Sequence, residues 1–170
     1  ARKRVVIMVG DHGVTAEGVS KFPSEVTAQM VSNFVNGGAG INALARQARA
    51  EVAVVDMGCA ADLSALAEAG KIISKKIGLG TANMALGPAM TRTNAVFAVE
   101  AGIQTAEQLA PETDLFATGD MGIGNTTPSA AIGAVICGAD LAEMVGRGTG
   151  VDDEGLARKR DAVARGMAVN

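Results

Sequence analysis

A glycine-rich segment from Thr118 to Pro128 has the side chains best suited to chemistry. It follows an apolar run that predicts a strand and precedes a predicted helix, so its glycines expose backbone N–H groups beside a helix N-terminus. Such an arrangement binds anions, phosphate above all. Asn125, Thr126 and Thr127 can either cap the helix or bind the phosphate, and the sequence leaves both roles open. Asp120 lies at the carboxyl end of the strand, where α/β proteins place their ligands.

A second glycine-rich turn runs from Val145 to Asp153 and includes Gly148. Alternating glycines permit close approach of the backbone to a ligand. Lys159 follows on a predicted helix. A lone helical lysine is usually solvated, but its place after this turn favours contact with a phosphate as a point charge.

Two further segments have polar side chains that could belong to a site. Asp11 and His12 come directly after the first strand and could act as acid and base, although a histidine beside a glycine turn is equally suited to a structural hydrogen bond. The loop from Gly78 to Thr91 has small polar groups and a Gly-Pro turn, which suit either a pocket wall or an ordinary surface loop.

Other familiar sites are missing. The sequence has no GxxxxGK[ST] motif, and the run from Gly122 to Thr127 has only the first two glycines of GxGxxG, which argues against a nicotinamide-dependent oxidoreductase. Cys59 and Cys137 form no CxxC pair, and His12 is the single histidine, so no metal site is expected. We interpret both cysteines as buried free thiols in a reducing cytoplasm.

The composition indicates a globular protein. Of 170 residues, 48% are hydrophobic and 19% are charged, which is enough apolar material for a core. A net charge of −3 and only four aromatic residues disfavour nucleic-acid binding. No apolar run is long enough to span a bilayer, and no signal peptide is recognisable.

The candidate residues require an α/β framework to position them. Continuous apolar runs predict strands buried on both faces, and amphipathic spacing predicts helices between them. This alternation favours a single α/β domain over residues 1–170, with a three-layer α/β/α Rossmann-like core and a mainly parallel sheet. The chain enters its first predicted strand almost at once and ends at Asn170 inside a predicted helix, so we expect the core to be incomplete at both ends and the chain to be a fragment of a longer one. The expected strands are Arg4–Gly10, Glu51–Gly58 and Asp114–Gly119; the expected helices are Ser24–Asn36, Ile41–Ala48, Asn94–Leu109, Thr127–Gly138 and a last one around Leu156, Val163 and Met167.

Six ordered blocks resemble one family along essentially the whole chain. They are Asp11–Val14, Glu17–Ser20, Glu25–Met30, Gly80–Asn83, Gly87–Thr91 and Gly122–Thr127. Their order and spacing are similar to nicotinate-nucleotide–dimethylbenzimidazole phosphoribosyltransferases. The resemblance implies transfer of phosphoribose from nicotinate mononucleotide to 5,6-dimethylbenzimidazole, giving α-ribazole 5′-phosphate and nicotinate for cobalamin assembly. It also implies a cytoplasmic homodimer without metal or cofactor.

The resemblance also implies roles for individual residues. Gly122, Asn125, Thr126, Gly148 and Lys159 correspond to the phosphate and ribose side of the family's site. Phe22, Gln29 and Met121 correspond to its base pocket. Asp120 corresponds to an acidic residue that is usually Glu, so its reach is one methylene shorter.

The family's main catalytic Glu has no counterpart in this chain. We therefore expect nucleotide binding without appreciable turnover. The alternative hypothesis is a non-catalytic module that binds a nucleotide or azole.

Overall fold

The computed structural model describes all 170 residues, which form four strands in one parallel sheet. The strands are β1 (Lys3–Gly10), β2 (Ala50–Gly58), β3 (Ile73–Ser74) and β4 (Leu115–Met121), in the order β3-β2-β1-β4. Every pairing is parallel. The apolar run of β1 places it in the middle, with Val6, Ile7 and Val9 buried on its two faces.

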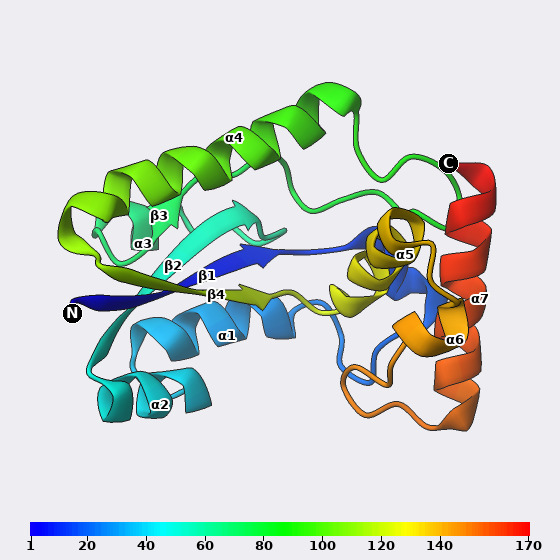
Figure 1. The fold of residues 1–170 in the computed structure, drawn as a ribbon, viewed down its shortest axis with the longest axis horizontal. Coiled ribbons are helices and arrows are strands. Elements are labelled where there is room, and N and C mark those ends of the chain that lie inside the picture. Colours follow the sequence, from blue (N-terminus) through cyan, green and yellow to red (C-terminus); the bar gives the residue numbers. More distant parts are fainter.

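Helices lie on both sides of this sheet. Figure 1 shows α4 along one face and α1 with α2 along the other, while α5, α6 and α7 gather beyond the carboxyl ends of β1 and β4. The predicted three-layer α/β architecture is therefore confirmed. The helices are α1 (Val26–Val35), α2 (Gly40–Ala48), α3 (Ser64–Glu68), α4 (Arg92–Leu109), α5 (Thr126–Cys137), α6 (Leu141–Met144) and α7 (Asp153–Val169), with 3-10 turns η1 (Gly13–Glu17) and η2 (Ala110–Glu112). None of them has the length and apolar character needed to cross a membrane.

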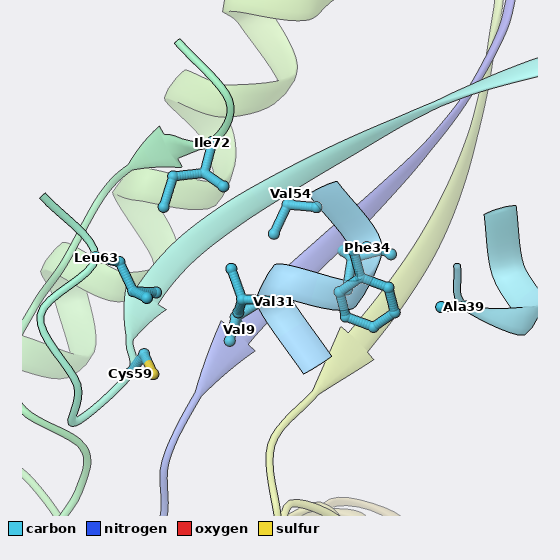
Figure 2. Packing of buried hydrophobic residues seen from close by; sticks show 9 residues of the cluster. Val9, Val31, Phe34, Ala39, Val54, Cys59, Leu63 and Ile72 are labelled. Carbon is cyan, nitrogen blue, oxygen red and sulfur yellow. The ribbon is translucent and has the colours of Figure 1, made fainter. Parts of the chain in front are cut away.

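One hydrophobic core lies between the sheet and α1 (Figure 2). Val31 and Phe34 project from successive turns of α1 onto Val9 and Val54 of the two central strands. These side chains are nearly or completely buried. Because strand side chains alternate between faces, the apolar stripe of α1 meets every second residue of β1 and β2. This packing holds β1 and β2 in place relative to α1 and so fixes the positions of their carboxyl ends.

A second core joins the C-terminal helices to the loop before α4. It contains Val14 of η1, Met84 and Ala85 of the loop, and Val163 of α7, all buried. A Cβ on Gly13 would lie 2.7 Å from the backbone of the same loop at Ala82, so only glycine permits this approach. The loop is therefore clamped between η1 and α7.

The structure also corrects details of the sequence prediction. The strand ending at Gly119 in the prediction continues as β4 to Met121, and the short β3, α3 and α6 were not predicted. Cys59 is a buried free thiol as expected, but Cys137 is exposed, so that prediction was wrong for the second cysteine. Cys137 is the last residue of α5, and no element covers this side of the helix. The preceding residue, Ile136, is 77% exposed for the same reason.

Candidate active site

The carboxyl ends of β1, β2 and β4 meet at one edge of the sheet. In the strand register, Val9 lies beside Met121, and Gly10 lies beside Gly58. The turn after β1 is tied to the turn after β2, because the Asp11 carboxylate accepts a hydrogen bond of 2.8 Å from the backbone N–H of Ala60. The carboxyl ends of the strands are thus held together at this edge, and the loops that follow them can surround a site.

A cavity of about 530 Å³ lies above this edge. The predicted residues Asp120, Met121 and Asn125 line it together, and His12 also faces it. Most of the remaining wall is apolar: Met8, Val9, Val14, Met57, Met84, Ala89, Met90, Ala95, Pro128 and Ile132. Such a cavity suits a flat apolar ring with a few polar atoms. Five of its lining residues are methionines, whose flexible thioethers adapt to a ligand's outline.

The turn between β4 and α5 is held close to β1 by Gly122. A Cβ at this position would collide with the carbonyl oxygen of Gly10 and would lie 3.3 Å from Nε2 of His12. The next residue, Ile123, donates its backbone N–H to the buried hydroxyl of Thr27 at 3.1 Å. Gly122 therefore lies within the predicted site but acts through close packing rather than as a wall of the cavity.

A buried cation lies at the start of α5. Lys159 is 1% exposed, and its Nζ donates to Oγ1 of Thr126 at 2.6 Å. It forms no ion pair, and burial lowers the pKa of its ammonium group. A Cβ on Gly148 would lie 2.8 Å from Nζ and 2.9 Å from the Thr126 hydroxyl, so three predicted phosphate-binding residues converge here.

The helix terminus beside this cation has no side-chain cap. Asn125 is the N-cap residue of α5, and its side chain makes no capping hydrogen bond. The sequence left two roles open for Asn125, and its side chain does not cap the helix. An uncapped helix N-terminus next to an unpaired buried ammonium is an electropositive site suited to an anion.

Two residues of the predicted base pocket lie elsewhere. Phe22 is 52% exposed in the segment before α1, and Gln29 is exposed on α1; neither lines the cavity. The structure therefore brings together Met121, Asp120 and Asn125 at the cavity, while Phe22 and Gln29 are outside it.

The loop that forms one wall of the cavity is anchored through Glu17. This carboxylate accepts hydrogen bonds of 2.6 Å from both Arg165 of α7 and Asn83 of the loop. These two donors, the arginine first, lower the pKa of Glu17. The anchor connects the helix of Lys159 to the loop that supplies Thr81, Met84 and Met90 to the cavity.

Comparisons with known proteins match the chain along essentially its whole length. A family model described as Phosphoribosyltransferase matches residues 1–170. The nicotinate-nucleotide–dimethylbenzimidazole phosphoribosyltransferases of Syntrophotalea carbinolica and Desulforudis audaxviator are 56% and 55% identical to the chain, and each match covers 99% of it. A crystal structure of CobT from Thermus thermophilus superposes with a TM-score of 0.94 at 49% identity, covering 99% of this chain and 50% of that one.

These matches also define what the chain represents. It spans about half the length of the curated relatives, 48% and 47% for the two named above. The family model matches the chain from before β1 to the end of α7. The chain therefore belongs to the nicotinate-nucleotide–dimethylbenzimidazole phosphoribosyltransferase family.

Proposed function

We propose that this chain forms the nucleotide-binding core of an enzyme that transfers phosphoribose from nicotinate mononucleotide to 5,6-dimethylbenzimidazole. The observation that carries the proposal is the buried, unpaired ammonium of Lys159, held at 2.6 Å from Thr126 at the uncapped start of α5. Burial of an ammonium without a counter-charge costs free energy, and a bound phosphate dianion would supply the negative charge that Lys159 lacks. Asn125 borders both this anion site and the cavity, so one nucleotide can occupy the two.

The reaction needs little covalent help from the protein. A nitrogen of the benzimidazole attacks C1′ of the ribose while the bond from C1′ to the pyridinium nitrogen breaks. The bonding electrons neutralise the ring nitrogen, and nicotinate leaves with its ring uncharged. Holding the nucleotide by its phosphate, with the attacking nitrogen of the base in line with the bond that breaks at C1′, therefore supplies much of the rate enhancement.

The second nitrogen of the benzimidazole must lose its proton during or after attack. Asp120 lines the cavity from the carboxyl end of β4 and is the acidic side chain there. We assign it the role of accepting or orienting that proton. The family resemblance places a further glutamate base beyond the residues of this chain, and the effect of substituting Asp120 measures how much the nearer carboxylate contributes.

Turnover and binding test this function separately. The chain is incubated with nicotinate mononucleotide and 5,6-dimethylbenzimidazole, and nicotinate and α-ribazole 5′-phosphate are followed by liquid chromatography. If both appear in equal amounts, Asp120→Asn is expected to slow the reaction by roughly 10–100-fold, whereas Asp120→Glu, which retains the carboxylate, remains active. Saturable nucleotide binding without either product, lost in Lys159→Ala, supports a nucleotide-binding core that lacks the family's main catalytic glutamate. Absence of both turnover and binding refutes the proposal.

The proposal includes a cytoplasmic, homodimeric protein, which the family resemblance implies. The uncovered apolar residues on α5, Ile132, Val135 and Ile136, agree with burial of this face in an assembly. Light scattering coupled to gel filtration measures the mass. A monomer at micromolar concentration contradicts the dimer without affecting the proposed chemistry.

A further inference from the structure

His12 is a polar group of the cavity that the proposed reaction does not use. It follows β1 directly, and its side chain lines the cavity together with Asp120 and Asn125. Burial lowers the pKa of the imidazole, while the nearby carboxylates of Asp11 and Asp120 act in the opposite direction with smaller effect. The ring is therefore neutral at neutral pH and has one N–H donor and one bare nitrogen.

The two ring nitrogens have different surroundings. Nδ1 is sealed from solvent and has no hydrogen-bond partner. Nε2 forms no hydrogen bond within the protein either, but it is not sealed, and glycine at position 122 leaves space beside it. A buried N–H without a partner is rarer in proteins than a buried acceptor without one, so the proton belongs on Nε2. The cavity thus contains a neutral donor that no group of the protein accepts.

The position of His12 relative to the anion site indicates which ligand group it meets. A nucleotide whose phosphate lies at Lys159 and Thr126 can extend along the turn from Asn125 to Gly122, where a Cβ added to Gly122 would lie 3.3 Å from Nε2 of His12. The end of the nucleotide remote from its phosphate is the pyridine ring. The benzimidazole has no spare acceptor, because its one bare nitrogen makes the new bond to C1′. We propose that Nε2–H of His12 donates to the carboxylate of the nicotinyl group and makes His12 a specificity-determining residue for nicotinate over nicotinamide nucleotides.

This proposal depends on the proposed function, which supplies the nucleotide. A nicotinate anion bound here would lie near Asp120, and the positive charge of the pyridinium would offset the repulsion between the two until the glycosidic bond breaks. A charged acceptor strengthens the hydrogen bond relative to the carbonyl of an amide. The preference for the acid should therefore depend on a donor at the position of Nε2.

Matched substitutions separate the two ring positions. The amide N–H of Gln reaches the position of Nε2, whereas that of Asn reaches only the position of Nδ1. Isothermal titration of the chain with nicotinate mononucleotide and with nicotinamide mononucleotide gives the ratio of the two Kd values for the unsubstituted protein, His12→Gln and His12→Asn. We expect a preference of roughly tenfold for the acid, retained in His12→Gln and lost in His12→Asn.

The outcomes distinguish this proposal from the proposed function. If the unsubstituted chain binds nicotinate mononucleotide but His12→Asn keeps the full preference, or no preference exists, the role of His12 is refuted and the proposed function stands. If the unsubstituted chain binds neither nucleotide, the proposed function fails and the role of His12 fails with it. Circular dichroism melting curves confirm that both variants are folded in each comparison.

Discussion

Lys159→Met should make the protein more stable and at the same time impair it as a nucleotide binder. The ammonium is 1% exposed and has one hydrogen-bond partner, Thr126, and no counter-charge. Desolvation of such a charge costs several kcal/mol, while its hydrogen bond to Thr126 returns about 2 kcal/mol. Met fills a similar volume without charge, so we expect the free energy of unfolding to rise by about 1–2 kcal/mol.

The effect on binding has the opposite sign. A charge-assisted hydrogen bond to phosphate contributes about 2 kcal/mol, which corresponds to a loss of roughly 30-fold in affinity for nicotinate mononucleotide. Urea unfolding and isothermal titration measure the two quantities on the same samples. Lys71→Met is the matched control because Lys71 is exposed and remote from the cavity, and it should change neither quantity appreciably.

The pH dependence provides an independent check. Burial lowers the pKa of Lys159 from its ordinary value of 10.5, so the folded protein binds this proton less tightly than the unfolded chain does. The destabilisation is complete below the folded pKa and disappears as the pH rises toward 10.5. The stability gain of Lys159→Met should accordingly shrink in alkaline buffer. A variant that is less stable at neutral pH, or one that binds the nucleotide normally, would refute the assignment of an uncompensated buried cation.

Three further substitutions test other parts of the structure. Thr27→Val leaves the buried N–H of Ile123 without its acceptor and should lower the free energy of unfolding by about 1–3 kcal/mol in urea, whereas an unchanged midpoint would show that the bond is dispensable. Gly148→Ala adds a Cβ at φ +52° against the buried ammonium and should weaken nucleotide binding roughly tenfold by titration, with unchanged affinity arguing against this turn as part of the site. Hydrogen bonds from Arg2 lower the pKa of Asp114 to about 2. Asp114→Asn should therefore lower the free energy of unfolding above pH 3.8, and the difference from the unsubstituted protein should disappear as the pH falls through 2. A difference that stays constant with pH would contradict the pair.

Much of the framework could be predicted because its signals are local. The apolar run of β1 and the spacing of Val26, Met30, Val31 and Phe34 in α1 each indicate one element without knowledge of the rest. The two residues of β3 could not be found in this way. Their strand conformation comes from pairing with β2, and a two-residue segment has no periodicity to detect.

The site was predictable in part for a related reason. The glycine-rich turns and the family resemblance predict Gly148, Thr126 and Lys159 as site residues, but the sequence does not show that Lys159 is buried against Thr126, 33 residues earlier in the chain. The methionine wall of the cavity was missed because its members are spread from Met8 to Met121 and share no motif. Only the convergence of strand ends and the clamped loop brings them together.

The two parts of the site differ in how their geometry is secured, and this difference follows from what each must hold. The anion site is built from a buried lysine, a helix terminus and a glycine turn that leaves no room for a Cβ beside the ammonium. The cavity wall is mostly thioethers, and Met90 is 40% exposed, so its outline can adjust. In the proposed complex, a phosphate held at this site would place C1′ of the ribose in the same position whichever base attacks. An adjustable wall can then seat the attacking base against C1′ without moving the nucleotide, so a change of base alters affinity at the wall while the point of attack stays constant.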